Sequence, residues 1–239
     1  MRLLRCGAML LIVACLCVSV GGCASGEQAA ESSESVKPKA SSDEPVQVEE
    51  EPVETTPEPE PEPDPIKLTG KGTKVTKKFA LADGLAVFSM SHKGSSNFIV
   101  HLRSVDGEVD EGLVNEIGKF NGSWPIFLGA GDYLLEVEAD GPWAFTITQP
   151  RPASVDVMTQ FKGKGKTATD IFYLDAGMKT VVLKHTGESN FIVHVHGVAD
   201  EGLVNEIGKF DGSVILDVPE SGGAIFSVEA DGDWSIKIE

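Results

Sequence analysis

An internal duplication constrains the fold of this chain more than any other feature of its sequence. Residues 110–120 return without a change as residues 200–210, and the Ser-Asn-Phe-Ile-Val-His sequence of residues 96–101 returns at 189–194. The offset between the copies changes from 93 to 90 residues and later to 91, so the length differences fall in loops. The folded part of the chain therefore consists of two copies of one unit.

Each copy has the sequence pattern of β-structure. Apolar and polar residues alternate in residues 98–102, 133–137 and 143–147, and no segment after the first 23 residues shows a helical period. Turns that contain Gly and Asp divide these stretches, and one is predicted at residues 121–123. About seven short strands per copy at this spacing predict an all-β chain with two tandem small antiparallel β-sandwich domains, each jelly-roll-like.

The stretch before the repeats has the composition of a disordered linker. Residues 24–65 hold thirteen acidic side chains, two lysines and eight of the 13 prolines, with no aromatic residue, Leu or Ile. Such a segment buries too little apolar area to offset the entropy of ordering. Pro150 and Pro152 interrupt the strand pattern between the copies. We therefore expect an export signal over residues 1–23, the acidic Pro-rich linker over 24–65, and sandwiches over 66–150 and 151–239.

The charge balance excludes nucleic acid as an expected partner. Against 37 Asp and Glu there are 20 Lys and Arg, which gives a net charge of −17. Phosphate repels such a polyanion, and the lysines form no basic stripe. All four cysteines lie in the first 23 residues, so we expect neither a disulfide nor a thiolate metal site in the repeats.

The first 23 residues have the pattern of an export signal. Arg2 and Arg5 come first, an apolar run over residues 6–20 is too short for a membrane-spanning helix, and two glycines precede Cys23. An uncleaved anchor or an ordinary cleaved signal is the alternative. The segment resembles the lipobox of bacterial lipoproteins, whose last cysteine receives a diacylglycerol. This resemblance implies a lipid on Cys23 and a protein held at the extracytoplasmic face of the cell membrane.

Patterns for catalysis or metal binding are weak. The sequence has no Gly-x-Ser-x-Gly elbow, so we expect a non-enzymatic protein without a cofactor. His194 and His196 share one strand face, but Arg103 replaces the second histidine in the first copy, and we expect solvent-facing histidines there instead of a metal site. Oxygen ligands suited to calcium recur in both copies without matching an EF-hand loop. These weak calcium candidates are Asp110, Glu111, Asp200 and Glu201.

One tryptophan is a candidate for stacking on a sugar ring. Trp124 follows the turn predicted at residues 121–123, and its counterpart in the second copy is Val214. Burial in the core is the alternative for this side chain. Trp143 and Trp234 share a strand face with apolar residues, and we place both in the cores.

The identical segments 110–120 and 200–210, called the shared run below, are a second candidate surface. A recent duplication explains their identity without any binding site, so both explanations stay open. If the shared run is a site, two copies on one chain bind a repetitive polymer with avidity. The candidate binding residues are Asn115, Glu116 and Lys119 with Asn205, Glu206 and Lys209, and the residues expected to pack are Leu113, Val114, Ile117 and Phe120.

The motifs Gly-Lys-Gly, Ser-Asn-Phe-Ile-Val, Leu-Val-Asn-Glu-Ile-Gly and Glu-Ala-Asp-Gly-x-Trp occur in both copies. Over residues 66–239 they resemble a β-rich repeat of uncharacterised secreted and lipid-anchored bacterial proteins. Residues 81–84 and 131–134 show a shorter similarity to the pre-peptidase C-terminal accessory domains of secreted peptidases, which implies an accessory or binding role. We therefore expect a lipid-anchored surface protein that binds an extracellular glycan, a cell-wall polymer or a partner protein. A structural spacer or adhesin stalk is the alternative, and a secreted enzyme or its accessory subunit is less favoured.

Overall fold

The structure is a computed structural model that describes residues 61–239. The regular structure in this range consists of β-strands. No helix long and apolar enough to cross a membrane is found among these residues. The predicted export signal, Cys23 and most of the predicted linker lie outside the described residues.

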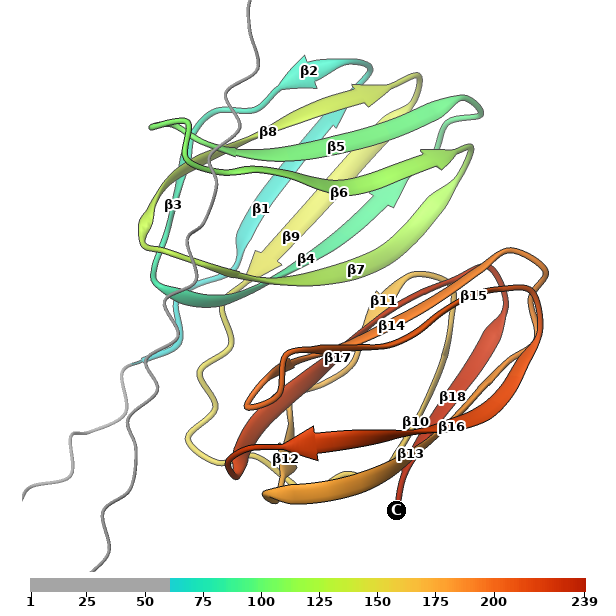
Figure 1. The fold of residues 1–239 in the computed structure, drawn as a ribbon. Coiled ribbons are helices and arrows are strands. Elements are labelled where there is room, and N and C mark those ends of the chain that lie inside the picture. Colours follow the sequence, from blue (N-terminus) through green and yellow to red (C-terminus); the bar gives the residue numbers. More distant parts are fainter. Residues whose placement is uncertain (1–60) are drawn as a thin grey trace, which may run out of the picture. The chain divides into compact units, whose positions relative to one another are not determined.

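The first copy forms a sandwich of two antiparallel sheets (Figure 1). Its strands are β1 (Ile66–Lys71), β2 (Lys74–Val75), β3 (Phe79–Leu81), β4 (Gly84–His92), β5 (Asn97–Ser104), β6 (Asp110–Ile117), β7 (Phe120–Leu128), β8 (Gly131–Ala139) and β9 (Pro142–Thr148). Sheet A has the order β1-β9-β4-β7. Sheet B has the order β2-β8-β5-β6, and β3 also pairs with β8.

The second copy repeats this sandwich strand for strand. Its strands are β10 (Gln160–Lys164), β11 (Thr167–Ala168), β12 (Phe172–Leu174), β13 (Gly177–His185), β14 (Asn190–Gly197), β15 (Glu201–Ile207), β16 (Phe210–Val218), β17 (Gly222–Ala230) and β18 (Asp233–Ile238). Sheet C has the order β10-β18-β13-β16, and sheet D has the order β11-β17-β14-β15, with β12 also paired to β17.

Both sandwiches have the strand order of a jelly roll. Counted as eight positions along the chain, one sheet has the order 1-8-3-6 and the other has the order 2-7-4-5. The second position is divided into two short strands, β2 and β3 or β11 and β12, which gives nine strands per copy instead of the predicted seven or so. The predicted all-β class with two tandem antiparallel sandwiches is confirmed.

Each sandwich has its own apolar core between its two sheets. The side chains of β5 alternate between buried and more exposed, which is the period of a strand with one face on a core. Trp143 and Trp234 are 4% and 5% exposed, so the predicted core position of both is confirmed. Their indole N–H groups donate to the backbone oxygens of Gly72 and Gly165 at 3.0 and 3.2 Å, so neither ring buries an unpaired donor.

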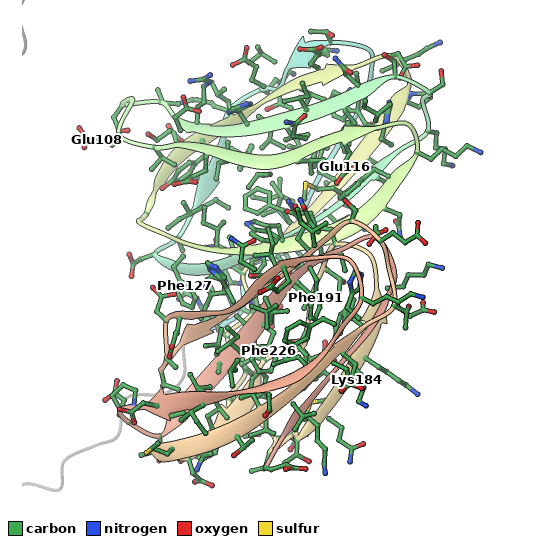
Figure 2. The ribbon with its side chains drawn as sticks, turned by 45° about the vertical axis from the view of Figure 1, so that its right-hand side comes forward. Glu108, Glu116, Phe127, Lys184, Phe191 and Phe226 are labelled. Carbon is green, nitrogen blue, oxygen red and sulfur yellow. The ribbon has the colours of Figure 1, made fainter. Side chains whose placement is uncertain are left out.

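The two cores are filled by different residues. Phe88 of sheet A corresponds to Val181 of sheet C, and both side chains are fully buried. Leu135 of sheet B corresponds to Phe226 of sheet D, whose ring lies 4.8 Å from that of Phe172, between the sheets (Figure 2). Volume lost from one sheet is thus regained from the opposite sheet, which preserves close packing.

The connection between the sandwiches runs from β9 to β10. The amide of Gln149, which is 5% exposed, accepts from the N–H of Ala82 at 2.9 Å and donates to its carbonyl at 2.7 Å. The carbonyl of Asp156 accepts from the N–H of Tyr173 at 2.8 Å. Gln149 is therefore attached to the first sandwich and Asp156 to the second, and residues 150–155 join these two points.

Candidate binding surfaces

The shared run forms the edge strand of one sheet in each sandwich. β6 is the outer strand of sheet B, and β15 is the outer strand of sheet D. A β-bulge interrupts both strands: Val100 pairs with Val114 and His101 pairs with Gly112, which leaves Leu113 without a pairing residue. Leu113 and Val114 therefore both face the core although they are consecutive, and their expected packing is confirmed.

Ile117 and its counterpart Ile207 do not pack as expected. These side chains are 79% and 80% exposed. Each is the last residue of its edge strand, and the following Gly118 or Gly208 has φ of +90° or +92°, a conformation that turns the chain away from the sheet. The apolar side chain is therefore left in solvent at the end of the strand. Phe120, in contrast, packs against the core as expected.

The predicted polar residues of the shared run are all exposed. Asn115, Glu116 and Lys119 lie along β6 and the turn after it, and Asn205, Glu206 and Lys209 occupy the same places around β15. Within residues 61–239, no side-chain hydrogen bond or ion pair involves any of these six side chains. The structure thus presents the same exposed amide, carboxylate and ammonium groups twice, together with an exposed isoleucine.

The shared run and the core differ in how far they have changed between the copies. Some buried positions differ between the copies, as Phe88 with Val181 and Leu135 with Phe226 show. Other buried positions are unchanged, as Phe98 with Phe191 shows. The shared run has not changed at any position, and most of its side chains are exposed. Exposed residues ordinarily tolerate substitution better than core residues do. The shared run is therefore identical in two copies that differ at some of their buried positions.

A buried histidine holds the end of each shared run. His92 is 1% exposed, and its Nδ1–H donates to the carbonyl of Gly118 at 2.7 Å. Its ring stacks on Phe98 with centroids 4.7 Å apart, and Nε2 lies 3.3 Å from Oδ1 of Asp140. Backbone N–H donation from Ser95 lowers the pKa of Asp140. His92 is therefore a buried clamp on the turn that follows Ile117.

The second sandwich repeats this clamp. His185 is 3% exposed, donates to the carbonyl of Gly208 at 2.8 Å and stacks on Phe191 with centroids 4.7 Å apart. Its Nε2 lies 3.2 Å from Oδ1 of Asp231, whose pKa is lowered by backbone N–H donation from Glu188. Both shared runs therefore end in the same fixed geometry.

Trp124 lies where the two sandwiches meet. The predicted turn at residues 121–123 is wrong, because β7 is continuous through this segment. The Trp124 side chain is partly buried against the core, and Nζ of Lys166 lies 4.3 Å from the centre of its ring. One face of the indole is therefore covered by a cation from the second sandwich, which leaves Trp124 less suited to stacking on a sugar than expected.

Short hydrogen bonds join β7 to the segment around β11, and this contact is called the junction below. The N–H of Ser123 donates to the carbonyl of Lys166 at 3.2 Å, and the Oγ of Ser123 accepts from the N–H of Ala168 at 2.8 Å. A Cβ on Gly122 would collide with the carbonyl of Lys166, so this close approach requires glycine.

Lys166 is a central residue of the junction that the sequence pattern did not reveal. Its side chain is 10% exposed, and Nζ donates to Oε2 of Glu229 at 3.0 Å while it covers Trp124. Thr73 occupies the equivalent place in the first copy. Comparing Lys166 with Thr73 does not predict its contacts, because they are made with Trp124 of the other copy.

Replacing Lys166 with alanine should loosen the junction. The change removes the cation–π contact with Trp124 and the ion pair of Glu229, so we expect a loss of about 1–2 kcal/mol in the free energy of unfolding. Thermal unfolding and a red shift of tryptophan emission measure the effect. Lys164→Ala, at a lysine that is 74% exposed, is the control and should change neither reading. Equal effects of the two changes would contradict the junction described above.

Glu116 of the shared run lies near the charged side chains of the junction. Desolvation raises its pKa, and the nearby Glu229 adds to this shift while Lys166 opposes it. Because the pKa of Glu116 is raised in the folded protein, its ionised form lowers the free energy of unfolding when the pH is above the ordinary pKa of the group. Protonation at lower pH removes this loss.

Glu116→Gln should therefore stabilise the protein at pH 7 by up to about 0.5 kcal/mol, a small value because solvent screens the exposed carboxylate. The gain should vanish once the pH falls below 4.5, the ordinary value for this group. Chemical denaturation at a series of pH values measures it. Glu206→Gln makes the same change in the second copy and should show no such gain. A destabilised Glu116→Gln variant at pH 7 would refute this explanation.

The calcium candidates are not gathered into one site. Asp110 accepts from Arg103 at 2.7 Å, and Asp200 lies 3.3 Å from Nδ1 of His196. Glu111 and Glu201 are exposed on their edge strands. No group of three or more His, Cys, Asp or Glu side chains in the described part of the chain is placed to hold a metal ion.

His194 and His196 share one strand face as expected, with ring centroids 5.9 Å apart. His194 is exposed, but His196 is partly buried, and its Nε2 lies 2.9 Å from the Oγ of Ser227. Burial lowers the pKa of His196, and the carboxylate of Asp200 partly opposes this shift. The expectation of two solvent-facing histidines therefore holds for His194 alone.

Comparison with known proteins gives no family. No protein-family model and no curated protein matches the chain. One similar solved structure is a conserved protein of unknown function from Pseudomonas aeruginosa PAO1, with 8% identity, 73% of this chain and 79% of that chain covered, and a TM-score of 0.22. Another is the stem and receptor binding domain of the spike protein from bacteriophage PM2, with 9% identity, 77% and 81% covered, and a TM-score of 0.17. At these TM-scores neither similarity carries an argument.

Proposed function

We propose that this chain is a non-enzymatic lipoprotein, anchored through Cys23 at the extracytoplasmic face of the membrane, whose two sandwiches bind a repetitive extracellular polymer. The polymer is a glycan or a cell-wall polymer. The proposal is carried by one observation: the shared run is identical and mostly exposed in two copies that differ at buried positions such as 88 and 181.

The chemistry of the edge strands suits such a ligand. An edge strand leaves backbone N–H and C=O groups unpaired on its outer side. At this edge the shared run adds the amide of Asn115 on one face of the sheet and the carboxylate of Glu116 on the other. The exposed apolar side chain of Ile117 and the ammonium of Lys119 follow at the end of the strand. Hydrogen-bond donors and acceptors beside one apolar group match the alternation of hydroxyl and C–H surfaces on a saccharide. The His92 clamp fixes the end of this surface before binding, so binding a ligand costs little conformational entropy there.

Two surfaces that carry the same side chains on one chain favour a ligand with a repeating unit. When one surface is bound, the other meets the next unit at a high effective concentration, and this raises the overall affinity by about 10²–10⁴-fold. The predicted acidic Pro-rich linker would carry the sandwiches away from the lipid, because like charges and proline rings keep such a segment extended.

The proposal is tested by retention of the full chain, in detergent, on immobilised purified cell-wall polymers and host glycans. We expect retention on at least one polymer, and equal retention with calcium and with a chelator. Retention that depends on calcium would refute the metal-free surface. No retention on any polymer would overturn the proposal and favour a partner protein or a structural spacer, which crosslinking on intact cells would separate.

A further inference from the structure

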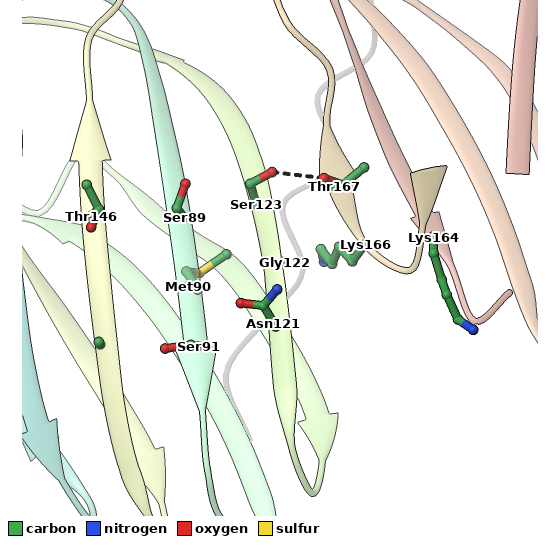
Figure 3. Close-up of a pocket in the computed structure, with 11 residues that line it drawn as sticks. Ser89, Met90, Ser91, Asn121, Gly122, Ser123, Thr146, Lys164, Lys166 and Thr167 are labelled. Atoms are coloured by element: carbon green, nitrogen blue, oxygen red, sulfur yellow. Dashed lines mark hydrogen bonds between the residues drawn. The ribbon is translucent and has the colours of Figure 1, made fainter. Parts of the chain in front are cut away.

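A cavity of about 430 Å³ lies beside the junction, over the outer face of sheet A (Figure 3). Its floor is made of outward side chains from β4, β9 and β7, and the turn between β10 and β11 of the second sandwich forms its wall. The volume is within the range of small-molecule sites. The cavity is separate from the shared run and was not predicted from the sequence.

Small polar side chains with no partner make the floor of this cavity. Ser89, Ser91 and Thr146 present hydroxyl groups, and Asn121 presents an amide (Figure 3). Among residues 61–239, none of these four side chains forms a hydrogen bond within the protein. Their donors and acceptors are therefore available to a ligand that carries hydroxyl groups.

The charge of the cavity is the opposite of that of the chain. The protein has a net charge of −17, yet of the residues that line the cavity in the described structure none is Asp or Glu. Lys164 and Lys166 line its wall. Lys166 is already paired with Glu229 at 3.0 Å, whereas Lys164 is 74% exposed and lies 3.9 Å from Asp233, at the limit of an ion pair. Lys164 can therefore turn to an anionic ligand at little cost.

The second sandwich does not repeat this floor. The positions of Ser89 and Ser91 are taken by Val182 and Lys184. Lys184 is paired with Asp211 at 2.9 Å. The hydroxyl-lined floor therefore occurs in the first sandwich, beside the β10–β11 turn of the second, and not at the equivalent place in the second sandwich. This indicates a site formed at the junction and not a site that each repeat carries.

We infer that this cavity binds a saccharide unit that carries a carboxylate. The hydroxyls of Ser89 and Thr146 hydrogen-bond to the sugar hydroxyls, and the ammonium of Lys164 pairs with the carboxylate. This site goes beyond the proposed function, because it uses neither β6 nor β15 and takes one sugar unit instead of a repeating polymer.

The inference is tested by calorimetry of the full chain in detergent with trimers of galacturonic, glucuronic and mannuronic acid, each compared with its carboxyl-reduced neutral trimer. We expect at least one acidic trimer to bind at least tenfold more tightly than its neutral form. Lys164→Ala should reduce this preference to less than about threefold. Lys71→Ala, which removes the counterpart lysine on β1, a residue that does not line the cavity, is the matched control and should keep the preference.

The hydroxyl groups are tested by the double variant Ser89→Val and Thr146→Val, which should weaken binding of the acidic trimer at least tenfold without changing its charge preference. Val is the residue that the fold already holds at position 182, so the sandwich accepts it. Val182→Ser in the second sandwich is the control and should leave binding unchanged. Failure of every acidic trimer to bind, or binding that survives the double variant, would overturn the inference. Neither outcome bears on polymer retention by the shared run, which variants of Asn115 and Asn205 test separately.

Discussion

Cys23→Ala should move the protein from the membrane to the soluble fraction almost completely. Two acyl chains contribute about 0.8 kcal/mol for each buried methylene, so their loss removes the whole of the membrane affinity that the resemblance to lipoproteins implies. Partition between detergent and aqueous phases measures the change. Metabolic labelling with a radioactive fatty acid should mark the unchanged protein and fail to mark the variant.

Cys15→Ala is the matched control, because Cys15 also follows small and apolar residues but lies inside the apolar run. This variant should stay in the detergent phase and keep its label. A Cys23→Ala protein that still partitions into detergent would end the lipoprotein interpretation and favour an uncleaved anchor.

Phe98→Ala and Phe191→Ala should each destabilise one sandwich by about 3–5 kcal/mol. Each phenylalanine is fully buried and stacks on the histidine that clamps the shared run, so its loss creates a cavity beside a buried polar ring. If the sandwiches fold independently, each variant should show one early thermal transition and one that is nearly unchanged.

Calorimetry of the full chain separates these transitions. Phe127→Ala is the control, since Phe127 is 51% exposed and its loss should cost no more than about 0.5 kcal/mol. A single cooperative transition that shifts as a whole in both variants would contradict two folding units with a boundary near residue 150. It would instead assign most of the stability to the junction.

The fold was largely predictable because the sequence repeats its β pattern. Alternation at residues 98–102 and the shared phase of Trp143 and Trp234 with their apolar neighbours place these side chains in cores. Local errors arose where alternation is broken. The bulge at Leu113 lets two consecutive residues face the core, and the turn at Gly118 leaves Ile117 in solvent. Neither the bulge nor the turn can be predicted from the alternation of apolar and polar residues along a strand.

The candidate surfaces were predictable only in part. The shared run was identified from its identity in two copies, because repetition is visible in one sequence. The clamp of His92 on Gly118 joins residues 26 positions apart, and the contact of Lys166 with Trp124 joins two different copies. The hydroxyl-lined cavity gathers residues from β4, β7 and β9 with a turn of the second sandwich. Such groupings depend on tertiary contacts between segments that have no common motif.

The central claim is that both shared runs bind one polymer together. The most direct test measures dissociation of the full chain from the retaining polymer for Asn115→Ala, Asn205→Ala and the double variant. We predict that either single change speeds dissociation by at least tenfold and that the double variant is not retained, because one surface alone lacks avidity. Dissociation rates that are the same in all three variants and the unchanged protein would contradict the claim.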